Sequence, residues 1–272
     1  MHGSDWWWDV GWNPFGGCTY VPQSPGCKNC FAPSWLASHT HRKDVHQGVT
    51  DRVNGRAVFN GKLTALPELD ELWDWPLYFP GVEKPKLGPA KPSLIWIGDM
   101  SDPFHEDRPK EIIDRALGTV VISRHIGLVL TKRTARMAEY FAAQSPHTVR
   151  LSQPKLWLGF SAENQECFDR RWTDVRPLAQ AGWFVFVSIA PMLGLVTLLP
   201  DFLALGPRTW VIVSGEQKIP RTRCRDMDPD WARAVRDQCR KAGIRFFVKQ
   251  MAKGAYIPPD LQIREFPSTD LL

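Results

Sequence analysis

Three of the six cysteines in this chain of 272 residues lie close together near its start, in the stretch GCTYVPQSPGCKNCF. They are Cys18, Cys27 and Cys30. Thiols this dense can form a disulfide, bind a metal ion or hold an iron–sulfur cluster. Glycine and proline residues make the loop 16–31 rich in turns, so it could curl around a small inorganic group.

The rest of the chain narrows this choice. Its first residues contain no basic, apolar leader, and no stretch of about 18 apolar residues occurs anywhere, so we expect neither a signal peptide nor a membrane span. The expected location is the cytoplasm, where thiols stay reduced and disulfides are rare. We expect the remaining cysteines to be inert buried thiols; they are Cys167, Cys224 and Cys239.

Two kinds of metal site remain possible for the loop. A structural zinc site needs a fourth ligand, which could come from His39, His41, His46, Cys224 or Cys239. A four-iron–four-sulfur (4Fe-4S) cluster held by only three cysteines instead leaves one iron with an open position. The spacing alone slightly favours zinc.

The composition indicates a large folded core, because 43% of the residues are hydrophobic. The formal net charge of +5 is compatible with a polyanionic partner but does not require one. Thirteen tryptophans are enough to supply both core and an aromatic pocket.

The elements that must position the loop are predicted from short apolar runs that end in polar residues. Such runs are typical of parallel strands covered by helices. They occupy residues 93–102, 126–133, 156–164, 183–191, 209–216 and 244–250, with further candidates at 58–66 and before Asn13. We therefore predict one domain over residues 1–272, a (β/α) barrel with a complete or nearly complete set of eight strands.

Helical patterns separate these runs. Asp107 is expected to cap the first helix, 135–143 is expected to form the second, and a third should start near Asn164 and be interrupted by Pro177. A C-terminal helix–strand unit is predicted over 228–250, with a cap at Asp228 and an end at Gly243.

Polar side chains follow nearly every predicted strand. In barrels of this type the carboxyl ends of the strands form the active site. The side chains in question are Asp99, Ser101, Asp102, Lys132, Arg133, Ser161, Glu163, Asn164, Ser188, Ser214, Glu216, Lys249 and Gln250. They predict a polar pocket large enough for a nucleotide, although ordinary solvated loops would give the same pattern.

A cysteine loop at the rim of a parallel barrel favours the cluster over zinc. In radical SAM enzymes the open iron of a three-cysteine cluster binds S-adenosylmethionine (SAM), and one electron from the cluster yields a 5′-deoxyadenosyl radical that abstracts hydrogen from a substrate.

Six segments, taken in order, resemble the phage-associated three-cysteine-motif family, which is radical-SAM-like and distantly similar to spore photoproduct lyase. The segments read WNPFGGCTYVPQSPGCKNCFA, DMSDPFHEDRP, LVLTKR, LWLGFSAENQE, VIVSGE and DPDWARAVRDQCRKAGIRFFVKQ. The resemblance implies a radical SAM barrel with Cys18, Cys27 and Cys30 as ligands of a 4Fe-4S cluster, and with SAM as the second cofactor. Eight residues separate the first two cysteines, more than the usual three.

The resemblance also implies contacts to SAM. Ser161, Glu163 and Asn164 match an S-x-E-N strand end that hydrogen-bonds the ribose or the methionine part. Lys132 and Arg133 match a T-K-R motif and would pair with the carboxylate, and Thr64 lies in the segment LTALPELDEL, which would meet the amino group. Where relatives have S-C-E-P, this chain has Ser188-Ile189-Ala190-Pro191, which favours a different substrate or reaction.

The substrate is less well defined. Asp99 and His105 are the candidate catalytic acid–base residues, His105 being the expected proton carrier, although a capping or core role is equally open. A basic cluster beside the cysteine loop favours a substrate with phosphate, or is simply a solvated face; it contains His41, Arg42, Lys43, Arg52 and Arg56.

The resulting hypothesis is a radical SAM enzyme, an isomerase or hypermodification enzyme, acting on a nucleobase or modified-thymine side group of phage DNA in the host cytoplasm. Its electron donor would be a flavodoxin or ferredoxin. One alternative is a radical SAM lyase that repairs DNA photoproducts. The other is a zinc-stabilised nucleic-acid-binding protein without catalysis.

Overall fold

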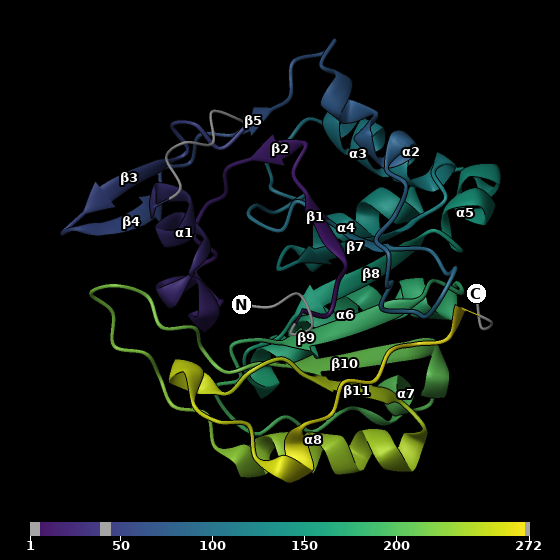
Figure 1. Cartoon of the computed structure of the whole chain (residues 1–272). Helices are drawn as coiled ribbons and strands as arrows, with labels where there is room; N and C mark the ends of the chain where they lie inside the picture. The colour runs from purple at the N-terminus through teal and green to yellow at the C-terminus, as the bar shows by residue number, and fades with distance from the viewer. Residues whose placement is uncertain (1–5, 39–44, 270–272) are drawn as a thin grey trace.

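The computed structural model describes residues 6–38 and 45–269. Its central element is a parallel sheet with the strand order β1-β6-β7-β8-β9-β10-β11, curled into a half-barrel (Figure 1). The strands are β1 (Val10–Trp12), β6 (Leu94–Ile97), β7 (Ile126–Thr131), β8 (Leu156–Ser161), β9 (Val185–Ile189), β10 (Thr209–Val213) and β11 (Arg245–Val248). All six of the apolar runs between 93 and 250, and the strand before Asn13, are therefore confirmed.

The prediction of a complete eight-stranded barrel is wrong, because the described residues form a parallel sheet of seven strands with β1 and β11 at its two edges. The segment 58–66 does not join this sheet. Its first part belongs to β4 (Arg56–Phe59), which pairs antiparallel with β3 (Thr50–Val53). Asn54 and Gly55 both have positive φ in the turn between them, and so tight a turn permits only antiparallel pairing.

The second part of the same segment forms β5 (Thr64–Ala65), which pairs antiparallel with β2 (Phe15–Gly16). The hairpin of β3 and β4 stands beside α1 (Ala32–Ser38), at the edge of the molecule (Figure 1). The small sheets thus accompany the cysteine loop and leave the parallel sheet open.

The long helices lie close to where the sequence predicts them. They are α3 (Lys110–Ile122), α4 (Thr134–Ala142), α6 (Gln165–Gln180) and α8 (Pro229–Ala242), and the short ones are α2 (Trp75–Tyr78), α5 (Pro146–Ser152) and α7 (Pro200–Leu203). Asp228 caps α8 by accepting a hydrogen bond from the backbone of Asp230, and Gly243 ends it with a φ of 69°.

Two details of the helices differ from prediction. The cap of α3 is Pro109, not Asp107, because a proline at the cap has no backbone N–H that would need a partner. Pro177 does not interrupt α6, which continues to Gln180. Trp172, Val175 and Leu178 are all buried on one side of α6, and their packing against the sheet holds the helix together across the proline.

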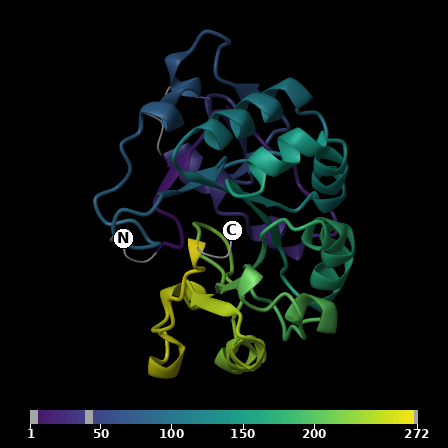
Figure 2. The same ribbon diagram turned by 90° about the vertical axis from the view of Figure 1, so that its right-hand side faces the viewer.

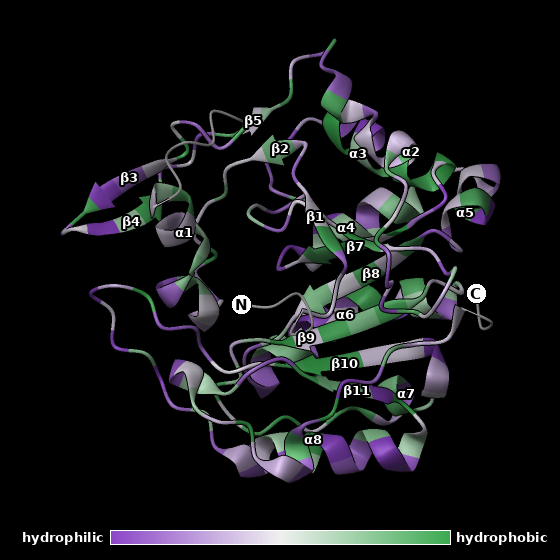
Figure 3. Cartoon of the chain, viewed as in Figure 1, coloured by the Kyte–Doolittle hydropathy of each residue, from purple (hydrophilic) through white to green (hydrophobic). Residues whose placement is uncertain are grey.

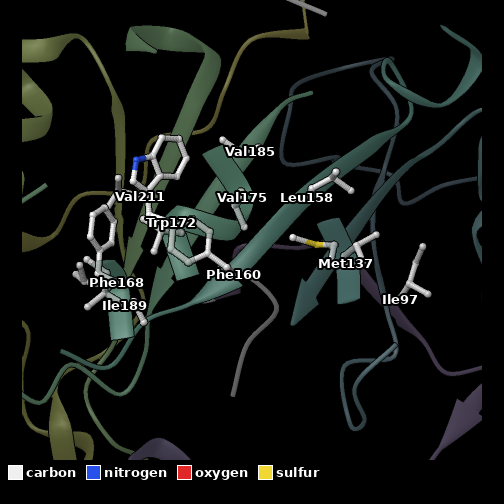
Figure 4. Close-up of a cluster of buried hydrophobic side chains, with 14 of the residues drawn as sticks. Ile97, Met137, Leu158, Phe160, Phe168, Trp172, Val175, Val185, Ile189 and Val211 are labelled. Atoms are coloured by element: carbon white, nitrogen blue, oxygen red, sulfur yellow. The ribbon is translucent and has the colours of Figure 1, made fainter. Parts of the chain in front are cut away.

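Alternate residues of each strand face two separate cores. Val185, Val187 and Ile189 of β9 pack outward against the helices, in the cluster that Figure 4 shows around Phe160 and Trp172. Figure 2 shows the helices arranged along this outer side of the sheet. In Figure 3 the strands are mostly hydrophobic, whereas α8 and the β3–β4 hairpin carry much of the hydrophilic surface.

The inner core is aromatic and is filled from the N-terminal segment. Trp7 packs against Trp96 of β6, Phe186 of β9 and Trp210 of β10, with ring centroids 4.7, 5.5 and 6.0 Å apart. Gly159 of β8 leaves the space that the ring of Phe186 occupies. The concave side of the half-barrel is therefore packed at the amino end of its strands.

Two expectations from the sequence concern a membrane span and the basic residues beside the cysteine loop. Within the described residues, no helix combines the length and the apolar character that a membrane crossing would need. His39, His41, Arg42 and Lys43 lie outside the described residues.

Candidate functional site

A cavity of about 530 Å³ opens at the carboxyl ends of the parallel strands. Inward-facing side chains at the strand ends form part of its wall: Ser161 and Ser188 within β8 and β9, and Lys132, Ser214 and Lys249 directly after β7, β10 and β11. Ser161 and Ser188 are direct partners in the register of β8 and β9, so their hydroxyls share one level of the sheet. A cavity is thus present where the strands end, and its wall combines these polar side chains with a larger share of apolar surface.

The three clustered cysteines all line this cavity. They belong to the loop 16–31, which contains a short 3-10 helix over Pro25–Asn29 that includes Cys27. All three are free thiols and are partly exposed, whereas Cys167, Cys224 and Cys239 are buried, as predicted. The fold therefore separates the two groups of cysteines.

One anchor of the loop is Glu163, which follows β8 and is fully buried. Ser24 of the loop donates a hydrogen bond of 2.5 Å to its Oε1. Lys132 pairs with Oε1 at 2.5 Å and Arg171 of α6 pairs with Oε2 at 2.8 Å. Gly26 is needed here, because a Cβ at that position would lie 2.6 Å from Oε1 of Glu163.

The two cations keep this carboxylate charged. Burial by itself would raise the pKa of Glu163, but the charges of Lys132 and Arg171 hold it well below its usual range. Both carboxylate oxygens of Glu163 have partners and Glu163 does not line the cavity, so the structure gives it a role in positioning the loop, while its implied contact to SAM stays a prediction.

A second anchor lies at Asn29, which donates hydrogen bonds of 2.9 Å to Glu216 and 3.2 Å to the backbone oxygen of Arg223. Glu216 follows β10 and is also paired with Arg225. Burial would raise the pKa of Glu216, but its hydrogen bonds from Arg225 and Asn29 lower it. The cysteine loop is thus fastened to the ends of β8 and β10 by two buried carboxylates.

Arg133 connects the start of the loop to the strand end after β7. Its guanidinium pairs with Asp102 at 3.0 Å and with Glu106 at 2.7 Å, and it donates to Thr19 at 2.8 Å. It also donates to Sγ of Cys18 at 3.6 Å. Arg133 lines the cavity, but these partners already occupy the donors that the resemblance assigns to the SAM carboxylate.

His105 is 2% exposed and is not among the residues that line the cavity. Its Nε2 lies 2.8 Å from the hydroxyl of Thr19, and its Nδ1 accepts a hydrogen bond from the backbone of Asp107. Burial lowers the pKa of His105, and the charge of Arg133 lowers it further. This geometry suits a residue that positions Thr19 beside Cys18 better than a proton carrier.

The other predicted site residues either line the cavity or stabilise neighbouring elements. Asp99 lines the cavity and accepts a hydrogen bond of 2.5 Å from Asn13. Asn164 caps α6 through the backbone of Cys167, and Thr64 donates to the backbone oxygen of Val45; neither lines the cavity.

Sequence reasoning missed Ser24, Asn29 and Arg171, which hold the loop in place. The signal for Arg171 was available, since it follows Phe168 by three residues on the apolar side of a helix, where an unpaired cation would be costly. Ser24 and Asn29 gave no such signal, because their partners lie far away along the chain.

The three cysteines that line the cavity can be compared with the ligands that an iron–sulfur cluster requires. Thiols are the ligands that such clusters take, and three of them share one cavity wall. Burial raises the pKa of Cys18 to about 12 and that of Cys30 to about 11, so both are thiols until a cation displaces the proton. In the described ranges, no group of three or more His, Cys, Asp or Glu side chains is gathered closely enough to hold a metal ion.

The cysteines therefore fit a cluster in ligand type and in the cavity they share, and binding would have to draw their sulfurs together. A closed zinc site has less support. Cys224 donates to the backbone oxygen of Glu216, and Cys239 is buried within α8. Neither these residues nor His46 line the cavity.

Comparison with known proteins supports this picture of the fold. A family described as "Protein of unknown function (DUF5131)" matches residues 4–265. A mutant of spore photoproduct lyase with bound S-adenosylmethionine and dinucleoside spore photoproduct is similar in structure, with a TM-score of 0.52 and 12% sequence identity; the match covers 89% of this chain and 81% of that one. No curated protein sequence matches the chain. The predicted likeness to spore photoproduct lyase is confirmed for the fold, while a link to phages stays a prediction.

Proposed function

Since this chain belongs to the DUF5131 family, whose description names no activity, we propose a function from its own site: a radical SAM enzyme that acts on a nucleobase or on a modified-thymine side group in DNA. One observation carries the proposal. Three free cysteines line a 530 Å³ cavity at the carboxyl ends of a parallel half-barrel, and the fold resembles that of a lyase with bound SAM.

Cys18, Cys27 and Cys30 would hold the cluster. When bound, it would supply one electron to SAM and so generate a 5′-deoxyadenosyl radical able to abstract hydrogen from carbon. The protein's part is position and charge. Glu163 and Glu216 hold the loop against two strand ends, and Lys132 places a cation near Cys30, which favours its thiolate.

The cavity wall also supports a polar, nucleotide-sized ligand. The hydroxyls of Ser161, Ser188 and Ser214 face it, and they can bond a ribose or a base edge. Arg56 of the β3–β4 hairpin lies at the same cavity and adds positive charge for a phosphate-bearing substrate. A flavodoxin or ferredoxin is the proposed electron donor.

Ala190 favours a substrate or reaction different from that of the typical relative. It lines the cavity next to Pro191, at the position where the resembling family has a glutamate. Replacing a carboxylate by a methyl group at the wall removes a charged contact to the substrate, so a different substrate or reaction is expected.

Anaerobic reconstitution with iron and sulfide tests the proposal. We expect a brown protein with four irons per chain, by the stoichiometry of a 4Fe-4S cluster, and 5′-deoxyadenosine formed from SAM and dithionite. Cys18→Ala, Cys27→Ala or Cys30→Ala should abolish both, whereas the buried control Cys167→Ala should keep them. A colourless protein with one tightly bound zinc would instead support the nucleic-acid-binding alternative.

DNA containing modified thymine and DNA damaged by ultraviolet light would then separate the two radical reactions. A mass-neutral or mass-adding change in the modified base supports the isomerase or hypermodification enzyme. Repair of the photoproduct, with the modified base left unchanged, supports the lyase.

A further inference from the structure

Lys249 is a cation of the cavity wall. It directly follows β11, on the edge of the sheet far from Lys132 and β7. Its Nζ lies 4.6 Å from the ring centroid of Trp6, 5.5 Å from that of Trp8 and 5.9 Å from that of Phe31. Two of these rings come from the N-terminal segment and the third from the cysteine loop.

The other two strand-end cations of the wall are already neutralised. Lys132 is paired with Glu163 at 2.5 Å, and Arg133 is paired with Asp102 and Glu106. For Lys249, residues 6–38 and 45–269 provide no carboxylate within 4.0 Å, and Asp99 acts on it only at longer range. As far as these described residues go, a bound anion would therefore meet Lys249 without displacing a paired carboxylate.

The aromatic surroundings prepare this amine for an anion. Ring faces stabilise an ammonium through their quadrupoles but leave its three N–H donors unused. They also remove water from the amine, which strengthens its attraction for a negative charge. The loss of water is consistent with a pKa for Lys249 that burial lowers to about 8.

We infer that Lys249 is the anion-binding residue of the cavity and receives a carboxylate or phosphate of the bound molecule. Within the proposed function, on which this inference rests, that anion has two possible sources: the carboxylate of SAM, or a phosphate of the nucleotide substrate. The aromatic rings beside Lys249 would then contact the rest of the ligand.

Paired probes distinguish the sources by calorimetry on the reconstituted protein. SAM is compared with 5′-methylthioadenosine, which lacks the carboxylate, and thymidine 5′-monophosphate is compared with thymidine. In Lys249→Met we expect the member of one pair that carries the carboxylate or phosphate to bind at least about tenfold more weakly, as is typical when a partly buried charge partner is removed, while its neutral counterpart stays within about twofold. Lys249→Arg should restore most of the binding.

The pair that responds identifies the source of the anion. Equal losses for charged and neutral probes, or no loss in either pair, would overturn the inference and leave Lys249 as a packing residue for the N-terminal tryptophans. Thermal unfolding of Lys249→Met and Lys249→Arg checks that both variants fold.

Measurements on the same samples distinguish failure of the proposed function from failure of the inference about Lys249. Iron content and 5′-deoxyadenosine formation report on the cluster, and the probe pairs report on Lys249. A protein that takes up no cluster but still discriminates thymidine monophosphate from thymidine through Lys249 would refute the proposed function and support the inference. A protein that takes up the cluster and forms 5′-deoxyadenosine, but binds the probes equally well after Lys249 is replaced, would support the proposed function and refute the inference.

Discussion

Glu163 shows at the level of one residue how a buried carboxylate can hold a loop in place. The family resemblance implies a contact to SAM, but the structure surrounds the carboxylate with Ser24, Lys132 and Arg171. A buried carboxylate is tolerated only with such partners, and removing it would leave two cations without theirs. Glu163 therefore links the cysteine loop, β8 and α6.

The variant Glu163→Gln should be unstable at neutral pH. Breaking a buried ion pair by removing one partner costs about 3–5 kcal/mol, so we expect a loss of that order in urea unfolding at pH 7. Glu166→Gln is the matched control, because its side chain is 81% exposed in the first turn of α6 and its loss should change stability by less than about 0.5 kcal/mol.

The pH dependence of this difference follows from the depressed pKa of Glu163. In the folded protein the pKa lies below the ordinary value of 4.5, so the stabilisation is fully present above that value and is lost as the pH falls below it. The gap between the wild type and Glu163→Gln should accordingly narrow between pH 5 and pH 3, on the scale set by that pKa. A gap that stays constant over this range would show that the charge of Glu163 does not stabilise the fold.

At the level of elements, the cysteine loop depends on close approach to the ends of two strands. The short helix Pro25–Asn29 brings Gly26 against Glu163 and Asn29 against Glu216. A side chain at Gly26 would also lie 3.0 Å from Cδ of Pro191. This contact is therefore one of the anchors that hold the cysteines at the cavity.

Gly26→Ala should therefore lift the loop away from β8. We expect a lower Tm and less iron bound after reconstitution, because the added methyl has no room beside a buried carboxylate. Gly118→Ala is the control: that glycine is exposed in α3 with no atom within 4 Å of its virtual Cβ, so alanine should raise stability by about 0.5–1 kcal/mol. Unchanged iron binding in Gly26→Ala would argue against the anchoring role of this contact.

At the scale of the whole molecule, an open half-barrel must fill its concave side with something other than an eighth strand. The N-terminal tryptophans do this. Trp7 is almost fully buried between Trp96, Phe186 and Trp210, and it also reaches the bottom of the cavity. The N-terminal segment thus helps to set both the stability and the volume of the site.

Trp7→Ala should cost about 3–5 kcal/mol of unfolding free energy, as is usual for truncating a buried aromatic residue. Tyr78→Ala serves as the control, since Tyr78 is 79% exposed and its loss should have little effect. Guanidinium unfolding at equal protein concentration measures both. Similar midpoints for the two variants would contradict the proposed packing of the inner core.

The local elements and the types of chemistry could be predicted from the sequence alone. Strands and the ends of α8 follow from short-range patterns, namely apolar runs, Asp228 before the helix and Gly243 after it. Clustered thiols and polar residues at the strand ends likewise predict a functional site, because the carboxyl ends of parallel strands meet at one edge of the sheet.

The number of strands in the sheet and the pairing of the buried charges could not be predicted from the sequence and became visible only in the tertiary structure. The turn at Asn54 and Gly55 diverts a strand-like segment into a hairpin, and Trp7 occupies the inner face. Arg133 and Glu163 resemble ligand-binding residues in sequence, yet both form ion pairs with internal partners, whereas Lys249 contacts aromatic rings and, among the described residues, has no carboxylate within 4.0 Å. The physical reason is that charge pairing and closure depend on contacts between residues far apart in the chain, and a local pattern cannot specify those contacts.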